Sequence, residues 1–393
     1  MTTSWQDIKS FCGTGAGRVF RDLGWRRKSR DSITGSPLPP ALSCRSLSKS
    51  FGDFQALNSI DLEIQSGEVV ALLGPSGCGK TTTLRLIAGF EQPDSGTILL
   101  EDEVISDKAI CLPPNKRDIG MVFQDGALFP HLTVRDNLGF ALDGMANKKH
   151  LIDEMLEKVQ LTEFQNRLPY QLSGGQQQRV AIGRALISSP QLLMMDEPFS
   201  NLDSTLRYQI REEVRHIVRE AGITTIFVTH DQQEAMYFGD TIAVMNQGVI
   251  EQFGTPEEIF HEPKSKFVAE FIGSVDFLPC KLSQEQLVSE VVTVNLQSNP
   301  SIVNTILSSK QPPEFMSRPD CIEVSPSDIG HGTIMSREFY GAFYMYLIKL
   351  HSGTVLRSLM PHTSEYPPGQ LVNLTLRDGH HLKTFVAGQL VEV

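Results

Sequence analysis

The hydrophobic positions in the first part of the chain follow the periods of buried strands and amphipathic helices. The segment Ile60–Ile64 alternates apolar and polar residues, which predicts a half-exposed strand. Glu68–Leu73 is a short apolar run, typical of a strand that is buried on both faces. A Gly-rich turn follows this run, and the spacing over Lys80–Ala88 predicts a helix that ends at Gly89.

The same alternation of strand and helix patterns continues to about residue 240. Gln191–Met195 and Ile223–Val228 have the composition of buried strands, whereas Ser204–Glu220 and Asp231–Phe238 have helical spacing. Strands that alternate with helices indicate a mainly parallel sheet covered by helices. This part of the chain is therefore predicted to be an α/β domain.

The pattern changes at about Val275, where short β-rich runs are separated by Pro and Gly. Examples are Val291–Leu296, Tyr340–Leu350 and Leu371–Leu376. We expect a small all-β, barrel-like domain over residues 274–393. At the other end, residues 1–40 are polar and basic and end in a Pro-rich linker, which predicts a flexible basic arm.

Composition and charge exclude several classes of protein. The chain has 393 residues, of which 40% are hydrophobic and 21% charged, as in ordinary globular proteins. The formal net charge of −11 argues against non-specific binding to nucleic acid or to anionic lipid. No run of about 18 apolar residues occurs, so any role at a membrane is expected to be peripheral. The six cysteines are scattered and suit a reducing compartment.

The turn after Glu68–Leu73 matches the pattern of a phosphate-binding loop. Gly74–Thr81 reads GPSGCGKT, in which the glycines let backbone N–H groups point at a phosphate and the helix N-terminus adds partial positive charge. Lys80 can neutralise the phosphates, and the Thr81 hydroxyl can ligate Mg²⁺. We expect a nucleotide to contact Gly74, Pro75, Ser76, Gly77, Cys78, Gly79, Lys80, Thr81 and Thr82.

Two adjacent acids follow the predicted strand Gln191–Met195. Asp196 would lie at the carboxyl end of that strand, beside the phosphate loop, where it can hold Mg²⁺ through water. Glu197 can polarise the water that attacks the phosphate.

A further string is more specific than the phosphate loop. Leu172–Gln176 reads LSGGQ and runs on as QQRVAIGRAL, which resembles the signature motif of ATP-binding cassette (ABC) ATPases. The resemblance covers residues 41–273 and implies a P-loop cassette with a mixed, mainly parallel sheet and a helical subdomain at about 125–175. The signature residues are Leu172, Ser173, Gly174, Gly175 and Gln176.

The resemblance also implies roles for single residues. Phe51 stands where the family places an aromatic ring against adenine, and Gln124 matches the glutamine that touches Mg²⁺ and the attacking water. His230 matches the switch histidine, so the implied catalytic residues are Glu197, His230 and Gln124, and the implied Mg²⁺ ligands are Thr81, Gln124 and Asp196. The string SNLD resembles the loop that crosses the dimer interface and comprises Ser200, Asn201, Leu202 and Asp203.

The resemblance implies a homodimer, because in that family the signature of one subunit completes the nucleotide site of the other. Two ATP molecules would each lie between Lys80 of one chain and Ser173 of its mate. Ser173 itself lies in a motif that has no obvious local ligand in the sequence. Binding of ATP would close the pair, and hydrolysis would open it.

The chain resembles the ATPase subunit of ABC importers more than an exporter half. The segment after Gln124 carries two predicted helices, at about residues 134–142 and 148–160, which in related importers receive a helix of the membrane permease. The tail resembles the small TOBE-type regulatory barrel of iron, polyamine, sulfate, molybdate and sugar importers. Such a domain would serve either as a dimerisation module or as a ligand-binding domain. The implied partners are a membrane permease and, indirectly, an extracytoplasmic solute-binding protein. The implied location of this chain is the cytoplasmic face of the plasma membrane.

Family likeness favours ferric iron as the solute, with polyamine uptake as the near alternative. The strings that carry this likeness are Phe123–Pro130, Gly254–Phe260 and Phe271–Pro279. A soluble ABC ATPase of DNA repair or translation is the rival class. Repair proteins insert a long coiled coil between their two nucleotide motifs, and translation proteins carry two cassettes, whereas this sequence has one cassette and no sustained heptads.

Overall fold

The chain divides into two compact units. The computed structural model describes residues 39–142, 144–145, 147–200, 204–284, 286–296 and 300–391. One unit runs up to Pro256 and the other begins at Glu257. The predicted arm, residues 1–40, lies almost wholly outside the described residues. The contact boundary falls earlier than the predicted boundary at residues 273 and 274, so the helices α8 (Pro256–His261) and α9 (Lys266–Ile272) group with the second unit.

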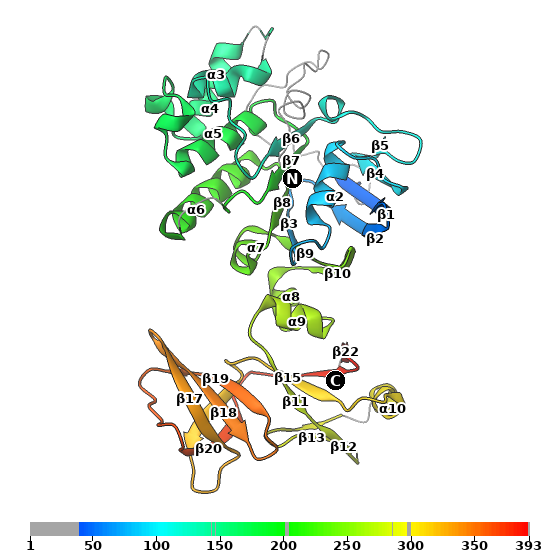
Figure 1. Ribbon diagram of the computed structural model, residues 1–393, viewed down its shortest axis with the longest axis vertical. Coiled ribbons are helices and arrows are strands. Elements are labelled where there is room, and N and C mark those ends of the chain that lie inside the picture. The colour runs from blue at the N-terminus through cyan, green and yellow to red at the C-terminus, as the bar shows by residue number, and fades with distance from the viewer. Residues whose placement is uncertain are drawn as a thin grey trace, which may run out of the picture. The chain divides into compact units, whose positions relative to one another are not determined.

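Two sheets form the first unit (Figure 1). An antiparallel sheet has the order β2 (Phe54–Ile64), β1 (Leu42–Phe51), β4 (Ser95–Leu100) and β5 (Glu103–Ser106). A six-stranded sheet has the order β10 (Val249–Gly254), β9 (Thr241–Asn246), β3 (Val69–Leu73), β8 (Thr224–Thr229), β7 (Leu192–Asp196) and β6 (Ile119–Val122). Its strands are parallel except for β10.

Strand β3 explains the short apolar run at Glu68–Leu73. All five of its residues are buried, because it lies between β8 and β9 in the middle of the sheet. A continuous buried cluster joins residues of both sheets, such as Ile64, Leu72 and Met194, with Leu84 and Ile87 of helix α2. This core fixes α2 against the sheet from which its loop comes.

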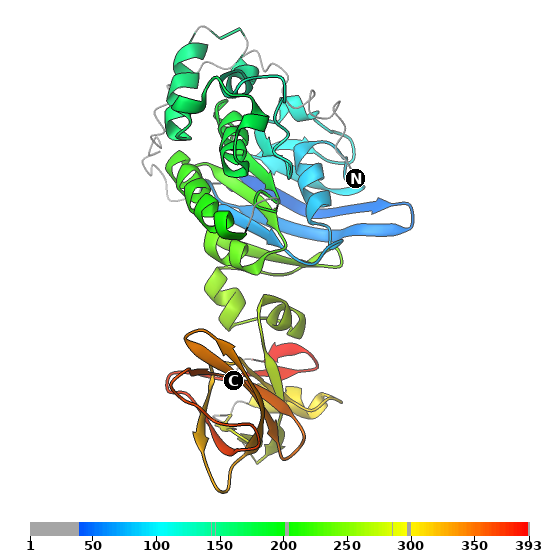
Figure 2. The same cartoon turned by 60° about the vertical axis from the view of Figure 1, so that its left-hand side comes forward.

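The helices of the first unit are α2 (Lys80–Ala88), α3 (Val134–Gly139), α4 (Lys148–Lys158), α5 (Gly174–Leu186), α6 (Ser204–Ala221) and α7 (Gln232–Phe238). Short 3₁₀ turns lie at Pro114–Lys116, Phe140–Leu142, Thr162–Phe164 and Pro169–Gln171. Helices α3, α4 and α5 gather at one end of the unit, away from the β1–β2 hairpin, where the helical subdomain is predicted (Figure 1, Figure 2). Within the described residues, every helix is too short or too polar to cross a bilayer.

The second unit is rich in strands and forms three antiparallel sheets. Their orders are β11 (Asp276–Pro279), β15 (Glu314–Ser317), β21 (Lys383–Val386) and β22 (Gln389–Val391); β12 (Lys281–Ser283), β13 (Gln286–Val288) and β14 (Thr293–Asn295); and β16 (Ile322–Pro326), β20 (Leu371–Leu376), β17 (Gly332–Tyr340), β18 (Phe343–Leu350) and β19 (Val355–Pro361).

The structure confirms the predicted fold class, an α/β cassette followed by a β-rich domain. It departs from an all-β second domain at α10 (Pro300–Ser308), an apolar helix whose residues are partly β-branched. The predicted strand Val291–Leu296 is shorter than expected, because only Thr293–Asn295 pairs with a neighbour.

Candidate functional site

A glycine-rich loop joins the end of β3 to the start of α2. Gly77 and Gly79 have positive φ angles of 81° and 112°, which residues with a Cβ rarely adopt. At Gly79 a Cβ atom would also lie 2.6 Å from Leu57 Cδ2 and 2.7 Å from the Ala56 carbonyl oxygen. The predicted loop Gly74–Thr81 thus has glycine where the backbone turns or touches its neighbours.

Lys80 is the first residue of α2 and is only 6% exposed. Its Nζ donates to the carbonyl oxygens of Gly74, at 2.7 Å, and Pro75, at 2.9 Å, and lies 3.7 Å from the sulfur of Cys78. The ammonium group is therefore held inside the loop, where it can neutralise a phosphate bound by backbone N–H groups. Thr81 follows on the exposed side of the first helical turn.

The parallel sheet brings four separate segments of the chain to one edge. The strands β6, β7, β8 and β3 are adjacent and parallel, so their carboxyl ends lie together. Gln124 follows β6, Asp196 ends β7, and His230 follows β8. Each of these residues therefore lies on the side of the sheet that carries the phosphate loop.

Glu197 is the centre of a hydrogen-bonded cluster at this edge. Its Oε2 accepts from Gln124 Nε2 at 3.2 Å, and its Oε1 lies 3.3 Å from His230 Nδ1. The Ser200 hydroxyl donates to the backbone carbonyl of Glu197 at 3.0 Å and accepts from Gln124 Nε2 at 3.3 Å. Gln124 and His230, the other two residues implied as catalytic, thus both contact Glu197.

The backbone of Glu197 has an unusual conformation. Its φ is +44°, a left-handed value that costs on the order of 1 kcal/mol for a residue with a side chain. Its N–H still donates to the Val228 carbonyl of β8 at 3.1 Å. The chain therefore turns out of the sheet at Glu197 while it stays attached to the neighbouring strand, and the carboxylate meets Gln124 and His230.

Asp196 is the acid that lies deeper in the sheet. Burial raises the pKa of Asp196 from 3.8 to about 6, with a smaller contribution from the charge of Glu197, while Lys80 and Arg85 oppose the shift. A half-buried carboxylate near a lysine-bearing phosphate loop is a suitable partner for a divalent cation.

The donor set fits Mg²⁺ held mainly by phosphates and water. Within the described residues, no group of three or more His, Cys, Asp or Glu side chains forms a closed metal site. Mg²⁺ commonly binds to one or two protein oxygens and keeps its other positions for phosphates and water. Oxygens of Thr81 and Gln124 as direct ligands, with Asp196 acting through water, suit that pattern.

Ser173 has a local role that the sequence did not reveal. It is the N-cap of α5, where its hydroxyl oxygen accepts from Gln176 N–H at 3.3 Å while its own N–H donates to Gln176 Oε1 at 3.0 Å. Ser173 therefore has a hydrogen-bond partner within its own helix, and a contact with the nucleotide of a second chain stays a prediction. The cap uses the oxygen as an acceptor and leaves the hydroxyl proton available. Ser173 and Gly174 are both exposed at the helix N-terminus.

Sequence reasoning did not identify Arg184, which links the signature helix to the segment after Gln124. Arg184 is 8% exposed on α5, and its guanidinium donates to the carbonyl oxygens of Ala127, at 2.8 Å, and Gly126, at 3.1 Å. It also lies 5.3 Å from the ring centroid of Phe129. An arginine on the buried face of a predicted helix is the signal that could have pointed to it.

Two other predicted groups remain separate from the cluster. Phe51 ends β1 with 46% of its surface exposed, and Lys49 Nζ lies 5.3 Å above its ring. The ring is thus open to a stacking partner, as expected of an adenine contact. Of the predicted dimer loop, Ser200 contacts Gln124 as described above, whereas Asn201, Leu202 and Asp203 lie outside the described residues.

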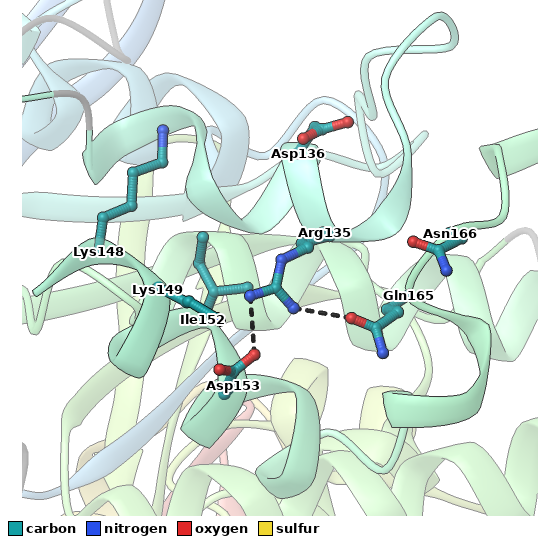
Figure 3. A pocket seen from close by; sticks show the side chains of 8 residues that line it. All are labelled: Arg135, Asp136, Lys148, Lys149, Ile152, Asp153, Gln165 and Asn166. Atoms are coloured by element: carbon teal, nitrogen blue, oxygen red, sulfur yellow. Dashed lines mark hydrogen bonds and ion pairs between the residues drawn. The ribbon is translucent and has the colours of Figure 1, made fainter.

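The helical subdomain carries an open pocket of about 700 Å³ (Figure 3). The Arg135 guanidinium points across it to Asp153, at 2.8 Å, and to Gln165, at 2.7 Å. It is lined by Arg135, Asp136, Lys148, Lys149, Ile152, Asp153, Gln165 and Asn166. Ion pairs and amides thus dominate this surface, and a permease groove in this subdomain stays a prediction.

Comparisons with known proteins agree with this geometry. Residues 57–200 match the ABC transporter family, and residues 316–382 match the TOBE domain. The chain is 41% identical over 340 residues to the spermidine/putrescine import ATP-binding protein PotA of Nitrosomonas eutropha, which covers 82% of this chain and 91% of that protein. It is 50% identical over 248 residues to the trehalose/maltose import ATP-binding protein MalK of Thermococcus litoralis, covering 61% of this chain and 67% of that protein.

A solved structure supports the same assignment. The protein cbiO1 of Clostridium perfringens, described as part of the ABC transporter complex cbiONQ, matches 57% of this chain and 92% of its own length. The TM-score is 0.52 and the sequence identity is 32%. With its phosphate loop, its signature helix and its β-rich C-terminal domain, the chain therefore belongs to the ABC family of ATPases, among the importer subunits that carry a TOBE domain.

Proposed function

We propose that this ABC ATPase drives the import of polyamines through a separate membrane permease. The contact of Glu197 with both Gln124 and His230, beside the lysine of the phosphate loop, carries the hydrolytic part of the proposal. The polyamine part is supported by PotA of Nitrosomonas eutropha, a relative that aligns through the C-terminal domain as well as the cassette. The expectation of ferric iron finds no support in the names of the relatives reported above.

In this proposal each residue of the cluster has one task. Lys80 neutralises the β- and γ-phosphates, and Glu197 orients the attacking water and accepts its proton as the bond to phosphorus forms. His230 donates to the γ-phosphate, and Gln124 holds the Glu197 carboxylate and the water in line. Thr81, Gln124 and Asp196 would hold Mg²⁺, which would offset part of the negative charge of the phosphates.

We propose further that two copies form the complete site. Ser173 and Gly174 are exposed at the N-terminus of a thirteen-residue helix, where hydroxyl, backbone N–H groups and helix dipole suit a phosphate supplied by a second chain. Phosphate contacts from both chains would hold the pair closed until hydrolysis releases them. The dimer would act at the cytoplasmic face of the membrane on permease subunits, which receive the solute from an extracytoplasmic binding protein.

Uptake in cells tests the solute assignment. We expect cells that lack other polyamine importers to accumulate radiolabelled spermidine or putrescine when they express this chain with its genomic neighbours. The same cells with Lys80→Ala should accumulate at most about a hundredth as much, because the phosphate charge is no longer neutralised. Uptake of ⁵⁵Fe³⁺ or of a labelled sugar, with no uptake of polyamine, would contradict the polyamine proposal but leave the ATPase assignment intact.

A further inference from the structure

Glu234 is a buried acid close to the site that the mechanism above does not use. It lies in α7, four positions after His230, and is only 4% exposed. Acidic side chains are almost never buried to this extent without a specific partner. The contacts of Glu234 therefore indicate how the turn around His230 is held in place.

The partner of Glu234 is the hydroxyl of Thr229, the last residue of β8. Thr229 Oγ1 donates to Glu234 Oε2 at 2.6 Å and accepts from the Asp231 N–H at 3.0 Å. Because a hydroxyl has one proton, donation to Glu234 turns the lone pairs of Thr229 toward Asp231. Thr229 and Asp231 flank His230 on either side, so this pair of hydrogen bonds closes the turn that carries the imidazole.

The same acid faces α6, which begins directly after the predicted dimer loop. The charges of Arg211 and Arg207 oppose the effect of burial, which raises the pKa of Glu234. Arg207 Nη1 lies 4.0 Å from Asp231 Oδ2, and Asp231 caps α7 by accepting from the N–H groups of Gln233 and Glu234. Two arginines of one helix thus lie opposite two acids that surround the histidine turn.

We infer that Glu234 is a positioning residue for ATP hydrolysis, which fixes the His230 turn through the Thr229 hydroxyl and connects that turn to α6. The inference rests on the proposed role of His230. Since α6 starts at Ser204, a change at the predicted dimer loop would reach the histidine through Arg207, Arg211 and these acids. Glu234 itself touches neither nucleotide nor water in this scheme.

A double-mutant cycle measures whether Glu234 acts through Thr229. In the purified full-length chain, Glu234→Leu and Thr229→Val should each lower kcat about tenfold and leave KM for ATP within about twofold, because ground-state binding is unchanged. The double variant should be no slower than either single variant, since both remove the same link. Glu234→Gln, which keeps an acceptor oxygen, should stay within about threefold of wild type.

The control is an ion pair at the other end of α7. Arg219 donates to Asp240 at 2.7 Å, and Asp240 also accepts from the Val69 N–H at 2.9 Å. Asp240→Asn weakens a similar link between α6 and the chain after α7, but ten positions away from His230. We expect it to lower Tm as much as Glu234→Leu does and to leave kcat unchanged.

A readout on the imidazole completes the test. In chain labelled with ¹⁵N-histidine, the His230 signal is identified by its loss in His230→Gln. It should move in Glu234→Leu and Thr229→Val and stay in place in Asp240→Asn. An unmoved signal, an additive double variant, or equal loss of kcat in Asp240→Asn would each overturn the inference. Full activity of His230→Gln would instead overturn the proposed role of His230.

Discussion

Asp196 shows how a partly buried charge opposes stability at the scale of one residue. The folded chain keeps a carboxylate whose pKa is about 6, and burial is the main cause. The ordinary value of 3.8 applies to the unfolded chain, so the folded chain binds an extra proton between about pH 4 and pH 6. Stability from this group is therefore present at low pH and is lost as pH rises through 6.

We predict that Asp196→Asn stabilises the chain at pH 8 and inactivates it. The neutral amide removes the cost of the buried charge, so the free energy of unfolding should rise by about 2 kcal/mol at pH 8. The gain should disappear near pH 4, where Asp196 is mostly protonated in the folded chain. Urea unfolding of both chains at the two pH values, without nucleotide or Mg²⁺, measures this. An equal difference at both values would show that the buried charge of Asp196 is not the cause.

At the scale of elements, α2 is held at both ends. Lys80 begins it inside the phosphate loop, and at its other end Arg117 donates to the carbonyl oxygens of Leu86, at 2.7 Å, and Ile87, at 2.8 Å. Arg117 is 1% exposed and also donates to the Leu112 carbonyl at 2.7 Å. A cation at the C-terminus of a helix interacts favourably with the helix dipole. Its N–H groups can also donate to the carbonyl oxygens that have no partner within the helix.

We predict that Arg117→Met loosens this helix. The change leaves the carbonyl oxygens of Leu86, Ile87 and Leu112 without the guanidinium, and the first two of these contacts are buried. The free energy of unfolding should therefore fall by about 3 kcal/mol. The affinity for ATP should fall too, because α2 carries Lys80. Lys116→Met, at the exposed neighbouring position, is the matched control and should change stability by less than about 0.5 kcal/mol. Equal effects of the two variants, measured by urea unfolding, would show that Arg117 does not hold α2.

Elements with a strong local pattern could be predicted from the sequence. The helix Lys80–Ala88 and the strand Leu371–Leu376 have the predicted bounds, because Gly89 ends the first and alternating burial marks the second. Helix α10 was not predicted, since its Ile and Val residues also suit strands. The phosphate loop and the acids after β7 were also predictable. The bonds of Arg184 to Ala127 and of Thr229 to Glu234 depend on packing that no local pattern reveals.

At the scale of the whole molecule, the proposed shared site has two complementary halves, and each chain would supply both. One half is the loop with Lys80 and the Glu197 cluster, and the other is the N-terminus of α5 with Ser173. The structure gives Ser173 a cap within its own helix, so a substitution that tests the shared site must preserve that cap. Aspartate is as good an N-cap as serine, and it would place a negative charge opposite the phosphate.

Complementation between two inactive chains tests the shared site most directly. Lys80→Ala and Ser173→Asp chains should each be inactive alone, and an equal mixture should regain about a quarter of wild-type turnover, because half of the randomly formed pairs contain one intact site. The control is wild type mixed with the Lys80→Ala/Ser173→Asp double variant, which contains the same substitutions. Its mixed pairs have no intact site, because each site receives one substituted residue. Mixing should therefore lower the activity of the wild-type chain. A mixture of the single variants that stays inactive, although both chains fold and pair, would contradict the shared site.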